Sequence, residues 1–136
     1  MRILALDYGS ARCGCALSDP TGTIVTPVEA VLRPATKRGF ARLRELVRER
    51  EVERVIVGLP LSLDGGDTEQ TRETRAFAHE PAARLGGAVP VEMHDERFTT
   101  RLAQRIDTAG GARAKASEDS RAAAHLLESW LAARAR

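Results

Sequence analysis

Residues 3–8 of the chain read ILALDY, an apolar run with a single carboxylate, Asp7, near its end. Such a run is typical of a strand that is buried on both faces of a sheet. An ionised carboxylate at the end of a buried strand loses solvation at a cost of several kcal/mol unless a cation or a donor compensates it. Gly9 and Gly14 leave the backbone after the strand open to close approach by a phosphate. The run therefore indicates a functional site, although Asp7 before Gly9 is also a common turn-capping pattern.

The length of 136 residues predicts one domain that spans residues 1–136. The 21 basic and 19 acidic residues give a net charge of only +2, so binding to nucleic acid would need a local basic patch. The sequence contains no signal-peptide core and no apolar stretch of membrane-spanning length, and we expect a cytoplasmic protein without membrane contact. Cys13 and Cys15 are expected to be small core residues, and an intermolecular disulfide is left open.

The remaining elements predict one compact α/β domain. Strands are predicted at 13–18 and 23–32, with the turn Asp19–Gly22 between them, and Pro27 marks the second as an edge strand or a bulge. Helices are predicted at about 36–50, 68–85, 99–106 and 117–136, and further strands within 52–61 and at 89–94. Gly58 and Pro60 are expected to halt one strand, and Pro81 predicts a kink or an early end in the second helix. The order predicts an antiparallel meander followed by βα crossovers.

Two further acidic positions lie at the ends of apolar segments, at Asp95–Glu96 and at Asp119. Because neighbouring residues of a strand face opposite ways, only one of Asp95 and Glu96 is expected to face Asp7, and alternation does not decide which. Asp119 is followed at helical spacing by four apolar residues that would place it on the helix face toward the sheet: Ala122, Ala123, Leu126 and Trp130.

Carboxylates gathered at one end of the sheet predict a metal site. Three or four hard oxygen ligands select Mg²⁺ or Mn²⁺ over zinc. Two such ions, about 3.5–4 Å apart, would stabilise the attacking and leaving oxygens of a phosphodiester. Arg97, Arg12 and Lys115 are candidates for contacts with substrate phosphates, although a solvated surface charge is the commoner role for Arg12 and Lys115. His94 is expected to be a structural strand residue. Three Phe, one Tyr and one Trp are too few for base stacking, so binding should be to backbone and shape.

Four blocks of the sequence, LALDYGSARCGCALSD, VIVGLPLSLDGG, VEMHDERFTT and EDSRAAAHLLESW, resemble the YqgF/RuvX family. This family is described as candidate pre-16S rRNA nucleases and formerly as candidate Holliday junction resolvases. The resemblance implies an α/β, ribonuclease-H-like fold with a five-stranded mixed sheet, its first three strands antiparallel, flanked by helices. It implies that Asp7, Glu96 and Asp119 are the catalytic, metal-binding acids. It thus chooses Glu96 and leaves Asp95 as a residue that supports the ligands.

One feature departs from many ribonuclease-H-like nucleases, in which an acid also ends the fourth strand. Here that strand ends in Gly58-Leu59-Pro60, with no carboxylate before Asp64. Because this acid is missing, we expect the site to bind a second metal ion only weakly. The glycine and proline could equally shape a groove beside the site or simply terminate the strand.

We therefore expect a nuclease that depends on Mg²⁺ or Mn²⁺, with two ions, and that processes the 5′ end of pre-16S rRNA during ribosome biogenesis. The alternative is a Holliday junction resolvase acting on branched DNA, which would work as a symmetric dimer. A non-catalytic, ribosome-associated binding module is the alternative of another class. The spacing of Asp7, Gly9 and Gly14 is also similar to a phosphate loop of actin-like ATPases, but those need two such domains. The sequence leaves open whether the protein is a monomer or a homodimer.

Overall fold

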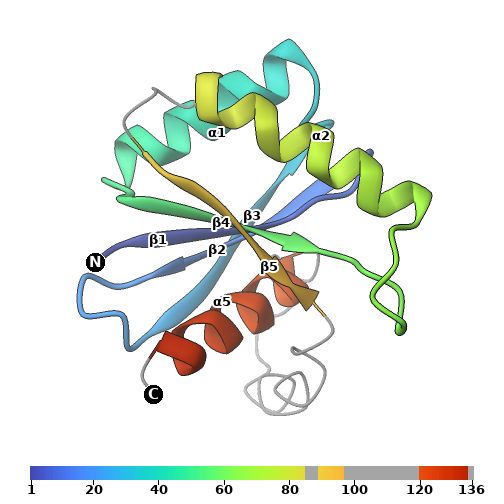
Figure 1. Ribbon diagram of the computed structural model, residues 1–136. Helices are drawn as coiled ribbons and strands as arrows, with labels where there is room; N and C mark the ends of the chain where they lie inside the picture. The colour runs from blue at the N-terminus through green and yellow to red at the C-terminus, as the bar shows by residue number, and fades with distance from the viewer. Residues whose placement is uncertain (85–88, 97–119, 135–136) are drawn as a thin grey trace.

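A five-stranded mixed sheet lies between two layers of helices in the computed structural model, which describes residues 1–84, 89–96 and 120–134 (Figure 1). The described strands are β1 (Ile3–Asp7), β2 (Arg12–Ser18), β3 (Val25–Leu32), β4 (Arg54–Leu59) and β5 (Val91–Asp95), and the described helices are α1 (Lys37–Glu49), α2 (Glu69–Arg84) and α5 (Arg121–Arg134). The strand order is β3-β2-β1-β4-β5. The first three strands are antiparallel, whereas β4 runs parallel to β1 and to β5. The predicted α/β sheet is confirmed; the helix predicted at 99–106 lies outside the described residues.

The hairpin between β2 and β3 closes at the predicted turn. The N–H of Gly22 donates to the carbonyl oxygen of Asp19 at 3.0 Å, and Gly22 has a φ of 74°, a conformation that favours glycine. β3 is an edge strand, as Pro27 predicted. Cys13 and Cys15 on β2 are free thiols with 0% exposure, so the folded chain presents neither of them for an intermolecular disulfide.

Each face of the sheet carries its own core. Under α1 and α2, Tyr8 stacks on Phe77 with ring centroids 4.4 Å apart. On the other face, Ala123, Leu126 and Trp130 of α5 are buried against the sheet, as predicted. The prediction for Ala122 was wrong, because this residue lies on the solvent side of the buried stripe of α5 and is exposed.

The helices begin and end largely where the sequence predicts. Thr36 caps α1, since its Oγ1 accepts a hydrogen bond from the N–H of Gly39 at 3.1 Å. Of the kink or early end predicted at Pro81, the early end is wrong, because α2 continues to Arg84. Burial of Phe77 and Ala78 in the turn before the proline offsets the hydrogen bond that the proline removes. Among the described helices, none is long and apolar enough to cross a membrane.

Candidate active site

Asp7 ends β1 on the sheet face that α5 covers. Along β1, Leu4 and Leu6 belong to the core under α1 and α2, whereas Ile3 and Ala5 belong to the core under α5. Because successive side chains of a strand alternate between the two faces, Asp7 follows Ile3 and Ala5. Its carboxyl group is partly buried. The apolar run thus delivers one carboxylate to the end of the sheet on the α5 side.

Glu96 follows β5 directly and reaches the same face. Met93 packs against the core under α1 and α2, so alternation directs His94 and Glu96 to the opposite face and Asp95 away from it. His94 confirms this direction, because its Nε2 lies 3.2 Å from Oγ of Ser129 on α5. Burial lowers the pKa of His94, against the raising effect of nearby carboxylates, which fits a structural histidine. Alternation therefore agrees with the family resemblance in choosing Glu96 once the face of Asp7 is known.

The carboxyl groups of Asp7 and Glu96 meet in a hydrogen bond. Burial, followed by this hydrogen bond and by the charges of Asp7 and Asp95, raises the pKa of Glu96 from its ordinary 4.5 to about 8. Glu96 therefore retains its proton at neutral pH in the absence of a cation. Two carboxylates that share a site retain a proton because they cannot both ionise without a compensating cation. The pair is chemically suited to a hard divalent cation that would replace this proton.

Gly58 provides the space in which the two carboxyl groups meet. β4 lies between β1 and β5, so the backbones that carry Asp7 and Glu96 are two strand spacings apart, about 10 Å. Gly58 pairs with His94, directly between the two acids. A Cβ atom on residue 58 would lie only 2.9 Å from Cγ of Glu96 and closer still to its Oε1. The missing side chain lets Glu96 extend over β4 toward Asp7.

The sequence leaves open whether Gly58 halts the strand or shapes a groove beside the site. The first of these predictions is wrong, because β4 continues through Gly58 to Leu59. The signal that was available is a glycine inside a strand, which often marks a position where another group approaches closely. In this chain the approaching group is the carboxyl group of Glu96.

Replacing Gly58 by alanine is expected to push the Glu96 carboxyl group away from Asp7 and toward solvent. Burial and the hydrogen bond to Asp7 would both weaken, so the pKa of Glu96 should fall by at least about one unit. Carboxyl ¹³C NMR titration of the metal-free protein measures this change. Gly66→Ala, in an exposed loop, is the matched control and should leave the pKa of Glu96 at about 8. An unchanged pKa in Gly58→Ala would contradict this role of the glycine.

Ser120 connects the start of α5 to the sheet near Asp7 through two hydrogen bonds. Its buried Oγ donates to the carbonyl oxygen of Val28 at 2.5 Å and accepts from the N–H of Cys15 at 3.0 Å. Cys15 follows Gly14, the strand partner of Asp7. The N-terminal end of α5 is therefore held close to the end of β1.

The other predicted site residues are distributed as follows. Arg12 is exposed and begins β2, two residues before Gly14. Asp119, Arg97 and Lys115 lie outside the described residues. Within residues 1–84, 89–96 and 120–134, no group of three or more His, Cys, Asp and Glu side chains is arranged to hold a metal ion. The described part of the site thus contributes an acid pair, and a third ligand would have to come from elsewhere in the chain.

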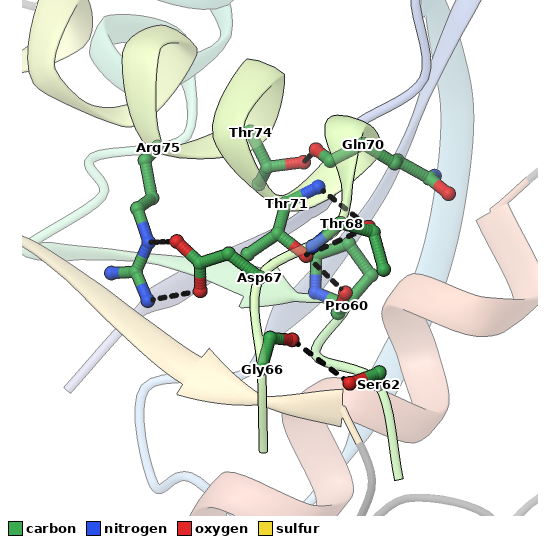
Figure 2. Close-up of polar contacts among 9 residues, drawn as sticks. All are labelled: Pro60, Ser62, Gly66, Asp67, Thr68, Gln70, Thr71, Thr74 and Arg75. Carbon is green, nitrogen blue, oxygen red and sulfur yellow. Dashed lines mark hydrogen bonds and ion pairs between the residues drawn. The ribbon is translucent and has the colours of Figure 1, made fainter. Parts of the chain in front are cut away.

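A polar network orders the connection from β4 to α2, which leaves the same end of the sheet (Figure 2). Thr71 Oγ1 donates to the carbonyl oxygen of Pro60 at 2.6 Å, and Arg75 Nε and Nη2 donate to the two carboxylate oxygens of Asp67 at 3.0 and 3.1 Å. The guanidinium group of Arg75 lowers the pKa of Asp67. Asp64, the first acid after β4, is exposed, and its carboxylate accepts hydrogen bonds from Oγ of Ser62 and from the N–H of Gly66. It therefore stabilises the loop between β4 and α2.

The sheet order β3-β2-β1-β4-β5, with three antiparallel strands first, is that of the ribonuclease-H-like fold, and two acids lie together at the end of its first strand. The chain belongs to the RuvX family, because residues 1–133 match the family model described as Holliday junction resolvase. The family predicted from the four sequence blocks is thereby confirmed.

Curated relatives resemble the chain over nearly its whole length. A protein of Mycobacteroides abscessus, named as a candidate pre-16S rRNA nuclease, is 42% identical over 139 residues, which cover 99% of this chain and 83% of the relative. A protein of Maridesulfovibrio salexigens with the same name is 36% identical and covers 97% of this chain and 98% of its own.

Solved structures share the fold at low sequence identity. Thermus thermophilus RuvC in complex with a Holliday junction substrate has a TM-score of 0.65 and 17% identity, covering 99% of this chain and 96% of that one. The Fowlpox virus resolvase in complex with Holliday junction DNA has a TM-score of 0.61 and 12% identity over the full length of both chains. At these identities the likeness shows the fold alone.

Proposed function

We propose that the chain is a divalent-metal-dependent nuclease that hydrolyses phosphodiester bonds in processing the 5′ end of pre-16S rRNA, in the cytoplasm. The observation that carries the proposal is the Glu96 side chain, which extends over Gly58 of β4 toward Asp7 at the end of β1. A partly buried acid pair at the end of a sheet is costly for stability and is typical of a functional site. The names of the curated relatives support the choice of substrate.

The residues that would hold the cations, Mg²⁺ or Mn²⁺, are Asp7, Glu96 and Asp119. Asp7 and Glu96 would supply hard carboxylate oxygens, and a bound cation would favour the ionised form of Glu96. The position of Ser120 supports the choice of Asp119 as a ligand. The Oγ of Ser120 accepts a hydrogen bond from the N–H of Cys15, and Cys15 follows Gly14, the strand partner of Asp7. Two bound cations would supply charge stabilisation for the attacking and leaving oxygens of the phosphodiester.

The remaining candidate residues would act around this centre. Asp95 faces away from Asp7, and its negative charge raises the pKa of Glu96, so we propose that it supports the ligand through electrostatics. Arg12, Arg97 and Lys115 are proposed to contact substrate phosphates. Such contacts position the nucleic acid without depending on its base sequence.

Cleavage assays with two substrates test the proposal. The full chain is incubated with a precursor 16S rRNA fragment that carries its 5′ leader and with a four-way DNA junction, each with Mg²⁺ or Mn²⁺ and with a chelator. We expect metal-dependent removal of the RNA leader, complete loss of activity in the chelator, and no paired cuts in the junction. Cleavage of neither substrate would contradict the enzyme and favour a binding module.

The junction resolvase is a second candidate, because the matching family model carries that description. A resolvase makes paired cuts with two symmetric active sites, so it predicts a homodimer. Paired junction cuts together with a dimer in analytical ultracentrifugation would favour this function. RNA cleavage by a monomer would favour the rRNA nuclease.

A further inference from the structure

Four exposed cations surround the same end of the sheet as Asp7, and we refer to Arg12, Arg33, Lys37 and Arg38 as the basic patch. The end of β1, the start of β2 and the end of β3 coincide because these strands are antiparallel. Arg12 pairs with Leu32 at the end of β3, and the N–H of Arg33 donates to the carbonyl oxygen of Ala11 at 2.9 Å. Lys37 and Arg38 follow at the start of α1. The patch therefore continues from the acid pair toward the edge of the sheet.

Arg33 occupies a backbone conformation that an arginine rarely adopts. Its φ is 44°, in the left-handed region that favours glycine, and it precedes Pro34, which restricts it further. Its carbonyl oxygen is held by the N–H of Thr36 at 3.1 Å and by Oγ1 of Thr36 at 2.7 Å. Glycine would satisfy the same hydrogen bonds with less strain, so the local structure does not explain the arginine side chain.

Lys37 and Arg38 oppose a second local preference. The first turn of a helix favours acidic residues because of the helix macrodipole, but the first turn of α1 contains no acid and these two cations. One turn further, Arg42 pairs with Glu45 at 3.3 Å and with Glu49 at 4.0 Å. By contrast, neither Lys37 nor Arg38 forms an ion pair with any residue that the structure describes.

We propose that the basic patch binds the backbone phosphates of a single-stranded nucleic acid a few nucleotides from the bond at the acid pair. The inference rests on the proposed function. Arg12 lies about 7 Å along the strands from the level of Asp7, and β3 lies about 10 Å across the sheet from β1. A nucleic-acid strand leaving the acid pair on the α5 side would thus pass around the ends of β2 and β3 and reach the start of α1, which covers the other face of the sheet. Its phosphates would compensate the charges of Lys37 and Arg38, for which the local structure offers no acid.

Binding of a fluorescein-labelled 20-nucleotide single-stranded RNA to the full chain tests the patch. Anisotropy is measured in a chelator, so that no cleavage occurs, and over a range of salt concentrations. The double variant Lys37→Ala/Arg38→Ala should lose about tenfold in affinity and lower the salt slope by about 1.4, the value for two lost single-strand phosphate contacts. The matched control Arg48→Ala/Arg50→Ala removes the same charge from the opposite end of α1 and should remain within about twofold of the wild type.

A second pair of variants separates binding from folding. Arg33→Gly relieves the strained backbone, so its melting temperature should stay within about 3 °C of the wild type or rise, while its RNA affinity falls about threefold to tenfold. Glu51→Gly is the control, because Glu51 also has a positive φ, 53°, at the far end of α1, and its affinity should not fall.

The outcomes distinguish the patch from the proposed function. If the wild type binds and cleaves RNA while the Lys37/Arg38 and Arg33 variants bind like the wild type, the patch is overturned and the nuclease stands. If the wild type neither binds nor cleaves RNA, both are overturned. Equal losses of affinity in the matched variants at the two ends of α1 would also overturn the patch, because the effect would then be one of net charge.

Discussion

Replacement of Asp7 by asparagine is expected to lower phosphodiester cleavage by about 10³-fold or more, because it removes one of the proposed metal ligands. The amide oxygen is a weaker ligand for a hard cation, and the amide nitrogen cannot ligate it. In the metal-free protein the same change removes the negative charge that Glu96 faces. The melting temperature should therefore stay constant or rise, which separates a lost site from a lost fold.

Initial cleavage rates of the RNA precursor, measured with purified protein at saturating Mg²⁺, test this expectation. Asp95→Asn is the matched control, since it changes the same functional group on the opposite face of β5. We expect this variant to retain activity within about tenfold, through a modest change in the electrostatics of Glu96. Activity that persists in pure Asp7→Asn would show that cleavage takes place at another site or in a contaminant.

Replacement of Glu96 by glutamine is expected to stabilise the metal-free protein at alkaline pH by about 2 kcal/mol, a value reduced from the full pKa shift because the group is only partly buried. In the unfolded chain Glu96 loses its proton near its ordinary pKa of 4.5, whereas in the folded chain it retains the proton until about pH 8. Between these values the folded state binds more protons than the unfolded state. The stability of the wild type should therefore fall as the pH rises from about 4.5 to 8 and level off above, and this contribution should be missing in Glu96→Gln.

Urea unfolding at several pH values in a chelator measures the difference. Glu29→Gln, an exposed acid on β3, is the control and should follow the wild type. Added Mg²⁺ should restore the stability of the wild type at high pH but have little effect on Glu96→Gln, because the cation takes the place of the shared proton. Identical pH profiles of the wild type and Glu96→Gln would contradict a coupled acid pair.

Local patterns predicted an antiparallel meander followed by βα units, and the family resemblance supplied the five-stranded mixed sheet. The run at residues 3–8 is apolar on both faces, the Asp19–Gly22 turn closes a hairpin, and the meander is followed by βα units, so few sheet orders remain. The boundaries of the strands and of α1 and α2 differ from the predicted ones by one or two residues, whereas α5 begins at Arg121. The error at Pro81 has a tertiary cause, because the packing of Phe77 on Tyr8 is not visible in the local pattern. The error at Ala122 came from extending the apolar stripe of α5 by one position.

The site could be predicted only in part. Asp7 was identified by its position alone, but the choice between Asp95 and Glu96 needed to know which face of β1 carries Asp7, and this depends on packing. The role of Gly58 depends on a residue 38 positions away that reaches across a neighbouring strand. Arg33 was not singled out, because its significance lies in a backbone angle that the sequence does not specify. The roles of Asp119, Arg97 and Lys115 remain predictions.

Glu96 lies at the tip of an outermost strand, and this position has a consequence for the timing of activity. While the ribosome is still making the chain, β1 to β4 and both helices above them emerge before residue 96 does. A partly synthesised chain would contain Asp7 and Gly58 but would lack the Glu96 carboxyl group that lies over Gly58. It would therefore lack one of the proposed ligands for a cation. If the proposed function holds, the three proposed ligands could not meet until Glu96 and then Asp119 have been synthesised, so the nascent chain would not yet cut the RNA around it.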